Sequence, residues 1–232
     1  MCETFLWIVL AAFFAATTAL AVYGLHLYVL LYLFRRKAAS RRREQQAVIT
    51  AYHHDHPADG WPIVTTQIPI YNERDVVKRA VEATASIDYP PDRHEIQVLD
   101  DSDDATRDTV DDLVRRLHAR GVDIKVIRRP SRSGYKAGAL AAGLASARGE
   151  YVAVFDADFV PPKEFLRQAI PLLEAQPDLA CLQGRWSHLN RHESWLTEAQ
   201  ALGIDGHFAI EQGARAWNGL MMNFNGTAGV WR

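Results

Sequence analysis

The first part of the chain contains a long segment without a formal charge. From Phe5 to Phe34 no Lys, Arg, Asp or Glu occurs. About 20 apolar residues cross a bilayer as a helix, so this segment is long enough to do so with some tilt. The length disfavours a buried core helix, and Glu3 without a neighbouring basic residue disfavours a cleaved signal peptide. We therefore predict a transmembrane helix over residues 5–34.

Basic residues follow this segment directly. They are Arg35, Arg36, Lys37, Arg41, Arg42 and Arg43. Because Lys and Arg collect on the cytoplasmic side of membrane helices, we expect the rest of the chain to be cytoplasmic. The protein is then integral to an inner, plasma or endomembrane. Residues 35–60 are interpreted as a basic and polar linker, and the histidines within Tyr52–His56 are more typical of solvated chain than of a metal site.

Size and charge limit what the remaining chain can be. The chain has 232 residues, a net charge of −2 and a pI of about 6.5. This length suffices for one membrane segment and one domain of ordinary size. The chain has no global excess of positive charge, so nucleic acid is not expected as a partner.

Residues 61–232 alternate apolar, β-rich runs with amphipathic helical patterns. This alternation is typical of an α/β domain with a mostly parallel sheet. The predicted strands are Ile63–Ile70, Glu95–Leu99, Val122–Ile127, Tyr151–Phe155 and Leu179–Leu182. Five helices are predicted. The first begins after a cap at Asn72, the second surrounds Val110–Leu117 and the third runs from Ala137 to Ala147. The fourth begins at Pro161-Pro162 with a kink or break at Pro171, and the fifth covers about residues 193–214.

Two aspartates come directly after the fourth predicted strand. Tyr151 to Phe155 form the apolar run, and Asp156 and Asp158 follow it. Residues two apart on an extended segment point the same way, so both carboxylates can reach one cation. Mg²⁺ and Mn²⁺ take such oxygen ligands and bridge to phosphate oxygens. On this pattern alone, a metal–diphosphate site and an Asp-rich turn that caps the next helix are about equally favoured.

Polar groups follow other predicted strands as well. In open α/β sheets, ligands bind outside the carboxyl ends of the strands. Tyr71-Asn72-Glu73 and Asp100-Asp101 follow the first two strands, as Asp156 and Asp158 follow the fourth. Lys136 lies at a predicted helix start, whose positive end suits a phosphate. For Lys136 the alternative is a surface lysine on a turn that contains glycine.

These motifs occur in a characteristic order. They are Pro69-Ile70-Tyr71-Asn72-Glu73, Val98-Leu99-Asp100-Asp101-Ser102, Gly134-Tyr135-Lys136-Ala137-Gly138-Ala139-Leu140, Phe155-Asp156-Ala157-Asp158, Gln183-Gly184-Arg185-Trp186 and Phe224-Asn225-Gly226-Thr227-Ala228-Gly229-Val230-Trp231-Arg232. From about residue 62 onward the chain resembles the processive, membrane-embedded family 2 glycosyltransferases, and most of all the cellulose-synthase-like A and C groups, which make mannan, glucomannan or glucan backbones. The resemblance implies an A-type glycosyltransferase fold, a Rossmann-like nucleotide-diphosphosugar transferase domain, over residues 61–232.

The resemblance also implies roles for individual residues. For the donor they are Tyr71 and Glu73 on the nucleoside, Asp100 and Asp101 on base or ribose, and Lys136 and Asp156 at the diphosphate. For a divalent cation, Mg²⁺ or Mn²⁺, they are Asp156 and Asp158. Near the transferred sugar and the acceptor they are Phe224, Asn225, Gly226 and Thr227.

The chemistry that the resemblance implies is inverting hexosyl transfer in polysaccharide biosynthesis. A hexosyl unit would pass from UDP-glucose or GDP-mannose to a glycan acceptor and form a β linkage. A cation and a lysine can stabilise the departing nucleoside diphosphate without protonating it. The attacking hydroxyl needs a carboxylate base to take its proton.

The chain departs from the family pattern at this base. The family places it in a Thr-Glu-Asp motif that is followed by Gln-x-x-Arg-Trp, and neither motif occurs here. Gln183-Gly184-Arg185-Trp186 has one residue fewer between Gln and Arg and lies earlier. We therefore expect a C-terminally incomplete domain, the N-terminal part of a longer enzyme, with the general base beyond residue 232.

Two other functions stay open on the sequence. Phe155 to Val160 also fits the Asp-x-Asp-x-Thr/Val motif of haloacid-dehalogenase-type phosphatases, although in those enzymes this strand opens the domain. The second is a membrane-anchored fragment that binds a nucleotide sugar without catalysis.

Overall fold

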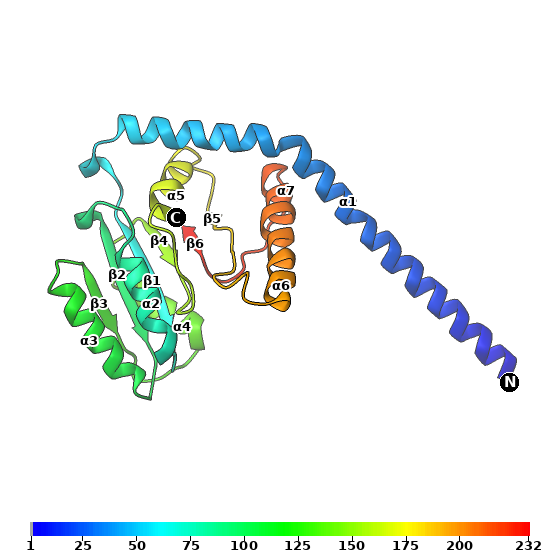
Figure 1. Ribbon diagram of the computed structural model, residues 1–232, viewed down its shortest axis with the longest axis horizontal. Helices are drawn as coiled ribbons and strands as arrows, with labels where there is room; N and C mark the ends of the chain where they lie inside the picture. Colours follow the sequence, from blue (N-terminus) through cyan, green and yellow to red (C-terminus); the bar gives the residue numbers. More distant parts are fainter. Residues whose placement is uncertain (1) are drawn as a thin grey trace. The chain divides into compact units, whose positions relative to one another are not determined.

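The computed structural model describes residues 2–232, with side chains from Glu3 onward, and Figure 1 traces its elements. The helices are α1 (Cys2–Asp55), α2 (Arg74–Ala85), α3 (Thr106–His118), α4 (Tyr135–Leu144), α5 (Phe165–Glu174), α6 (Trp195–Asp205) and α7 (Gln212–Trp217), with 3₁₀ turns at Ala58–Gly60 and Pro91–Arg93 and a π-helical turn at Gly206–Glu211. The strands are β1 (Val64–Ile70), β2 (His94–Asp100), β3 (Ile124–Ile127), β4 (Tyr151–Val154), β5 (Cys181–Gln183) and β6 (Gly229–Trp231).

The chain divides into two compact units, which are described separately. One combines α1 up to Glu44 with Arg185–Asn223, and the other consists of Gln45–Gly184 and Phe224–Arg232. The second unit contains the whole sheet, in the order β3-β2-β1-β4-β6-β5. Strands β1 to β4 are parallel, and β6 runs antiparallel to both β4 and β5. The predicted α/β domain with a mostly parallel sheet is therefore confirmed.

The core of the sheet unit lies between β1 and β2 and the two helices α2 and α3. Val77 and Val81 of α2 and Leu113 of α3 are completely or almost completely buried against Ile68 and Ile96. Fully burying such a side chain contributes about 1.5–3 kcal/mol. Because successive strand residues point to opposite faces, the neighbours of these strand residues face away from α2 and α3.

Helix α4 covers the opposite face of the sheet. A Cβ on Gly143 would come within 2.5–2.8 Å of side-chain atoms of Gln67, Gln97 and Leu99, so a glycine is needed for α4 to lie this close. Gln67 and Gln97 bond to each other across the strands, with 3.0 Å between Nε2 and Oε1. This close packing sets the distance between α4 and the sheet, and with it the position of the residues at the amino end of α4.

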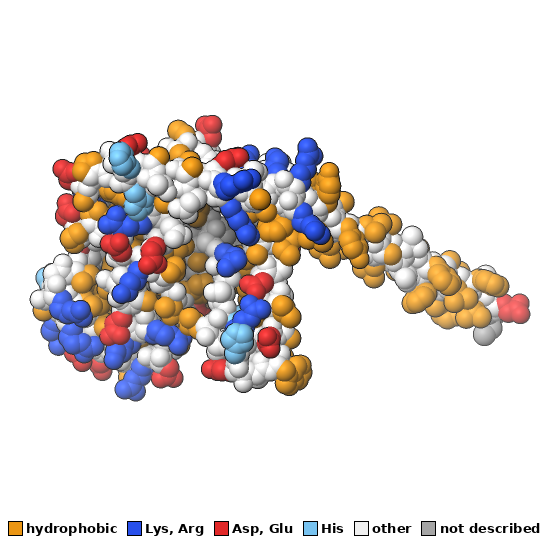
Figure 2. Space-filling model, turned by 45° about the horizontal axis from the view of Figure 1, so that its top comes forward, with side chains coloured by type: hydrophobic (Ala, Val, Ile, Leu, Met, Phe, Trp, Pro, Cys, Tyr) orange, Lys and Arg blue, Asp and Glu red, His pale blue; other side chains and the backbone are white. Residues whose placement is uncertain are grey.

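The apolar segment forms the first part of α1. Among the described residues, this one helix has the length and composition to cross a membrane. Its apolar side chains are largely exposed, as Trp7 and Tyr28 illustrate, and Figure 2 shows them along the helix with the first Lys and Arg side chains where they end. Within the first unit, Phe34 stacks on Trp217 at a ring distance of 5.6 Å, and Lys37 donates to the carbonyl of Trp217 at 3.1 Å.

The helix does not end where the apolar segment ends. A linker is predicted over residues 35–60, but α1 continues to Asp55 and only the turn Ala58–Gly60 follows. The physical reason is composition, since the stretch after Phe34 is rich in Ala, Arg, Gln and Glu and has no Gly or Pro before Pro57. The prediction that residues 35–60 form a linker is therefore wrong about their structure, because most of them are helical. The division into segments 5–34, 35–60 and 61–232 stays a prediction.

The end of α1 packs onto the sheet unit through aromatic rings. Trp61 is almost completely buried and meets Tyr52 of α1 and Tyr89 edge-on, at ring distances of 5.0 and 5.4 Å. Of the histidines near this helix end, His53 bonds to the carbonyl of Arg167 in α5 at 2.9 Å, and His56, which directly follows α1, bonds to the carbonyl of Tyr52 at 3.1 Å. The aromatic contacts make residues 52–61 part of the folded unit.

Two predicted helix features differ from the structure. The helix expected at Pro161-Pro162 begins only at Phe165, and it continues through Pro171 to Glu174 instead of breaking there. Packing explains the second difference, because Ile170, Pro171 and Leu173 are all buried and burial outweighs the missing hydrogen bond.

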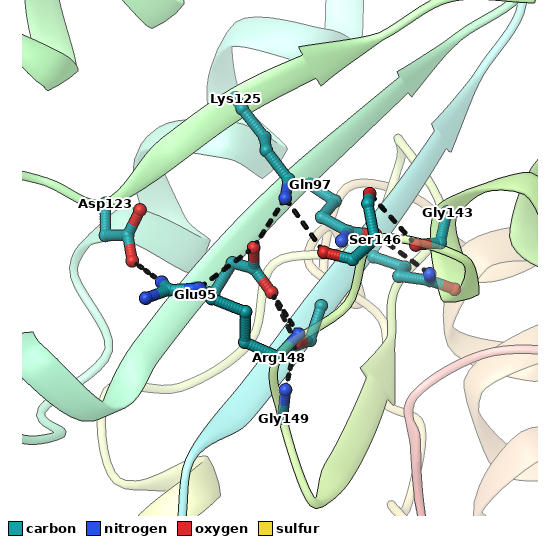
Figure 3. Close-up of polar contacts among 10 residues, drawn as sticks. Glu95, Gln97, Asp123, Lys125, Gly143, Ser146, Arg148 and Gly149 are labelled. Carbon is teal, nitrogen blue, oxygen red and sulfur yellow. Dashed lines mark hydrogen bonds and ion pairs between the residues drawn. The ribbon is translucent and has the colours of Figure 1, made fainter.

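A buried ion-pair cluster lies at the amino edge of the parallel strands. Figure 3 shows the Glu95 carboxylate between Lys125 and Arg148. Lys125 Nζ lies 2.7 Å from it, the Thr65 hydroxyl donates at 2.6 Å and the backbone N–H of Arg148 at 2.9 Å. Burial raises the pKa of Glu95, but these hydrogen bonds outweigh burial and lower the pKa to about 2. The cluster joins β1, β2, β3 and the segment before β4.

Because His94 lies buried next to this cluster, we predict that the protein loses stability in mild acid. Burial lowers its pKa from 6.5 to about 4, so the folded state holds the neutral ring that the Thr66 hydroxyl contacts at 2.8 Å. Between pH 6.5 and 4 the unfolded state binds more protons, so the free energy of unfolding falls by about 2–3 kcal/mol as the pH falls. Urea unfolding of the full chain at pH 7 and pH 4.5 measures this loss. His94→Gln should lose clearly less than the wild type, and equal losses would contradict the assignment.

Candidate functional site

The three groups predicted at strand ends do meet at one edge of the sheet. Strands β1 and β2 end in register, with Ile70 beside Asp100, and β4 pairs with β1 from the other side, with Gln67 beside Val154. The backbone N–H of Asp101 donates to the carbonyl of Ile70 at 3.0 Å. The residues after β1, β2 and β4 therefore share the carboxyl edge of the sheet, opposite to the Glu95 cluster.

The turn after β1 is braced against the loop after β2. Asn72 has a positive φ of 56°, and its side-chain amide donates to Asp103 at 2.7 Å while its backbone N–H donates to Ser102 at 3.0 Å. The predicted helix cap at Asn72 is wrong, since Glu73 occupies the N-cap position of α2 and makes no side-chain cap bond. The side chain of Asn72 bonds to the neighbouring loop instead of capping α2.

The charges of the other site residues act on the Glu73 carboxyl. The Tyr71 N–H donates to it at 3.3 Å. Burial raises the pKa of Glu73 most, and the negative charges of Asp158 and Asp156 raise it as well. The Tyr71 N–H and the positive charge of Lys136 lower it, but the net shift is upward. Glu73, Lys136 and the two aspartates after β4 therefore belong to one electrostatic site.

Asp100, the last residue of β2, and Asp101 after it are held by arginines that the sequence pattern does not predict. Asp100 accepts from Arg128 at 2.8–2.9 Å and from the Ser102 N–H at 3.0 Å, and its side chain has no exposed surface. The donor contact of Asp100 stays a prediction. Asp101 is paired with Arg129 and keeps 7% of its side chain exposed. Of the two carboxylates at this strand end, only that of Asp101 keeps exposed surface.

The aspartates after β4 lie on a turn. Asp156 and Asp158 are predicted on an extended segment, but the Phe159 N–H donates to the carbonyl of Asp156 at 3.0 Å and closes a turn there. Asp158 is exposed, whereas the Asp156 side chain is 35% exposed and forms an ion pair with Lys136. Both carboxylates are accessible at the sheet edge.

Lys136 is held at the amino end of α4 by a tight turn. Gly134 and Tyr135 both have positive φ, and Lys136 is the second residue of the helix. A Cβ on Gly138 would lie 2.1 Å from the carbonyl oxygen of Ser133, so glycine is required where this turn passes the helix. The predicted lysine at a helix start is confirmed, and its ammonium points to Asp156 and to the carbonyl of Gly226 at 2.8 Å.

The loop before β6 completes the group. The Asp156 N–H donates to the Thr227 hydroxyl at 2.8 Å, and Lys136 bonds the adjacent Gly226 carbonyl. Gln183 organises this loop, because its Nε2 donates to the Thr227 carbonyl at 2.9 Å and its Oε1 accepts from the Asn225 N–H at 3.1 Å. Phe224 packs edge-on against Trp231 at 4.9 Å, as part of the fold. Gln183 belongs to the Gln-Gly-Arg-Trp motif, which is the only sequence signal that points to it.

The acidic pair suits a divalent cation that a ligand helps to hold. Among residues 3–232 no three His, Cys, Asp or Glu side chains lie together as a ready-made metal site. Mg²⁺ is usually bound by one or two carboxylates together with phosphate oxygens of the substrate. Asp156 and Asp158 supply two hard oxygen ligands, and Lys136 beside them supplies positive charge for the same phosphates. The residues present therefore fit a cation–diphosphate group.

Known proteins are similar in sequence to this chain. The family described as Glycosyl transferase family 2 matches residues 66–229. Glucomannan 4-beta-mannosyltransferase 2 of Arabidopsis thaliana is 42% identical over 179 residues, which are 75% of this chain and 34% of the relative. Probable glucomannan 4-beta-mannosyltransferase 11 of Oryza sativa subsp. japonica is 44% identical over 176 residues, 74% of this chain and 31% of the relative. The chain thus spans about a third of the length of these relatives.

One solved structure is similar to part of this chain. The mannosyltransferase PcManGT from Pyrobaculum calidifontis, in complex with GDP-Man and Mn²⁺, is 26% identical, with a TM-score of 0.49 over 68% of this chain and 48% of that protein. The family match covers most of the chain and includes the ends of β1, β2 and β4. The predicted resemblance is therefore confirmed, and the chain belongs to glycosyl transferase family 2.

Proposed function

We propose that this chain forms the donor-binding part of an inverting hexosyltransferase that acts on a glycan. The observation that carries the proposal is the convergence of Tyr71, Glu73, Asp101, Lys136 and the Asp156–Asp158 turn at one carboxyl edge of a parallel sheet. Membership of glycosyl transferase family 2 supports this over the phosphatase alternative. Relatives named as glucomannan mannosyltransferases favour a GDP-mannose donor over UDP-glucose.

The donor would lie along the carboxyl edge, with its diphosphate near β4 and its nucleoside near β1 and β2. Asp156 and Asp158 would hold Mg²⁺ or Mn²⁺, which supplies positive charge to the departing nucleoside diphosphate. Lys136 would donate to the same diphosphate from the amino end of α4. Glu73 and Asp101 would accept from hydroxyls of the nucleoside. Residues 224–227 would line the space for the transferred sugar and the acceptor.

The chemical step in this proposal is a single displacement. An acceptor hydroxyl attacks the anomeric carbon from the side opposite the diphosphate, the bond from that carbon to the phosphate oxygen breaks, and a carboxylate base takes the hydroxyl proton. This gives a β linkage from an α-linked donor. No residue of the chain is assigned as the base, so binding of a nucleotide sugar without transfer stays the alternative for these 232 residues.

The same proposal includes the membrane. The apolar part of α1 would span the bilayer, and the basic residues after Phe34 would keep the sheet unit on the cytoplasmic side. Protease digestion of sealed vesicles tests this orientation. Protection of the sheet unit in vesicles whose cytoplasmic side faces outward would contradict it.

Calorimetric titration of the full chain in detergent with GDP and with UDP tests the donor site. Mn²⁺ should strengthen binding of one nucleotide by at least about tenfold, because the cation bridges protein carboxylates and phosphate oxygens. Asp158→Asn should abolish this gain. Asp178→Asn, which replaces an exposed aspartate outside the site, is the matched control and should behave as the wild type. A folded wild-type chain that binds neither nucleotide, or an unchanged gain in Asp158→Asn, would refute the proposal.

A further inference from the structure

The part of α1 that follows the apolar segment carries its positive charges on two opposite sides. Helix α1 continues without a break through six cations, which are Arg35, Arg36, Lys37, Arg41, Arg42 and Arg43. Residues seven apart in an α-helix lie two turns apart on one side, so Arg42 follows Arg35 there. Arg43 follows Arg36 in the same way, next to them. We call these four residues the arginine face. Lys37 and Arg41, four residues apart, share the opposite side.

The opposite side is occupied by protein. Lys37 donates to the carbonyl of Trp217, the last residue of α7, at 3.1 Å. Arg41 forms an ion pair with Glu44 at 2.9 Å. Glu44 is the only acidic residue in the sequence between Glu3 and Asp55. The one negative charge of this part of α1 is therefore used on the side that faces α7.

The arginine face is exposed and its charges are not compensated. Arg43 donates to the carbonyl of Ala39 in its own helix at 3.2 Å, and the Arg42 guanidinium lies 5.8 Å from the centre of the Phe34 ring. Within residues 3–232, the exposed Arg35 and Arg36 make neither an ion pair nor a hydrogen bond. Four cations thus stand together without an acidic partner, so this face suits an anion.

Two exposed tyrosines precede the arginine face on the same side. Tyr28 lies two turns before Arg35 and Tyr32 one turn before Arg36, and 71% and 62% of their surfaces are exposed. Tyrosine is typical of the boundary between hydrocarbon and headgroups. The rise from Tyr32 to Arg36 is about 6 Å, and the headgroup layer of one leaflet is about 5–8 Å thick. With Tyr32 at this boundary, Arg36 reaches the level of the lipid phosphates.

We propose that the arginine face, with Tyr28 and Tyr32, binds the headgroups of anionic lipids, an inference that rests on the proposed membrane insertion of α1. Guanidinium groups donate in pairs to phosphate and carboxylate oxygens. Phosphatidylserine offers both oxygens and a net negative charge, whereas the choline of phosphatidylcholine neutralises its phosphate. Lipid on one side and the Trp217 segment on the other then fix the rotation of α1 about its axis.

The test compares two double variants that remove the same charge from opposite sides of α1. The full chain in neutral detergent is titrated with phosphatidylserine, and native mass spectrometry measures the lipid bound per chain. Each arginine near an anionic surface contributes about fivefold, so Arg35→Gln/Arg42→Gln should bind about 20-fold more weakly. Lys37→Gln/Arg41→Gln should stay within about threefold of the wild type, because about 0.15 M salt screens charges beyond about 8 Å. Circular dichroism checks that both variants are folded.

Two further titrations identify the ligand. Phosphatidylcholine should bind the wild type at least about tenfold more weakly than phosphatidylserine, and millimolar inorganic phosphate should not displace phosphatidylserine. Equal losses in the two double variants would overturn the inference, because only the total charge would then matter. Equal binding of both lipids would overturn it as well, and displacement by phosphate would make the face a site for free phosphate instead.

These outcomes are separate from those of the proposed function. A folded wild type that binds nucleotide with Mn²⁺ but does not prefer phosphatidylserine would refute the lipid site alone. A wild type that binds no nucleotide would refute the donor site and leave the lipid site to its own titrations. Protection of the sheet unit in the vesicle digestion would overturn the orientation of α1 and the lipid site together.

Discussion

Replacing Lys136 by methionine is expected to lower the affinity for a nucleoside diphosphate by about 30- to 100-fold. A hydrogen bond to a charged group contributes about 1.5–3 kcal/mol, and the proposed site gives the ammonium a diphosphate as partner. In the structure the ammonium points to Asp156 and to the carbonyl of Gly226, so it is already held at the acidic pair. Methionine preserves most of the apolar stem. Titration with GDP in the presence of Mn²⁺ measures the loss.

Binding of Mn²⁺ alone separates the lysine from the carboxylates. Lys136→Met removes a cation that competes for Asp156, so the variant should bind Mn²⁺ at least as tightly as the wild type. Asp158→Asn should bind Mn²⁺ more weakly because it loses a ligand. Lys78→Met, at an exposed position of α2, is the control. If Lys136→Met and Lys78→Met bound GDP equally well, Lys136 would have no part in diphosphate binding.

Replacing Glu95 by alanine is expected to lower the free energy of unfolding by about 3–5 kcal/mol. The Glu95 side chain is 2% exposed and accepts from Lys125, Thr65 and the Arg148 N–H. Alanine leaves these donors without their acceptor and leaves space at the amino edge of β2. For a chain of this size the change corresponds to a fall of roughly 10 °C in the melting temperature. Thermal and urea unfolding, followed by circular dichroism, measure it.

A second glutamate provides the comparison. Glu82 is exposed on α2, and Glu82→Ala should change the stability by less than about 0.5 kcal/mol. The Lys125 and Arg148 side chains keep 39% and 54% of their surface exposed, so water can partly compensate them when Glu95 is removed. A loss in Glu95→Ala below about 1 kcal/mol would mean that water replaces the whole cluster, and that the cluster does not hold the strands together.

The local sequence pattern predicted the frame of the site well. Runs of apolar and β-branched residues predict β1, β2 and β4, although β1 and β2 also bury the polar side chains of Gln67 and Gln97, which bond to each other. Parallel strands place their carboxyl ends at one edge, so the convergence of Tyr71, Asp101 and Asp156 followed from the order of the elements. Lys136 at the start of α4 followed from the glycine before it.

Helix boundaries and caps were less predictable. The apolar run ends at Phe34, but α1 continues to Asp55 because good helix formers follow. Asn72 was predicted to cap α2 on its residue type alone, but its side chain bonds Asp103 on another loop. In α1 the helix propensity of the following residues extends the helix, and at Asn72 a neighbouring loop binds the side chain.

The sequence by itself determined the fold class, the strand order along the chain and the edge at which the polar residues gather. These features depend on the period and burial of short segments, which are local properties. Only the tertiary structure decided which of the polar residues stay accessible. It buried Asp100 under Arg128, used Gln183 to hold the loop at Thr227 and laid Arg132 on Tyr71. Each of these partners lies far away in the sequence, so no local pattern could pair them.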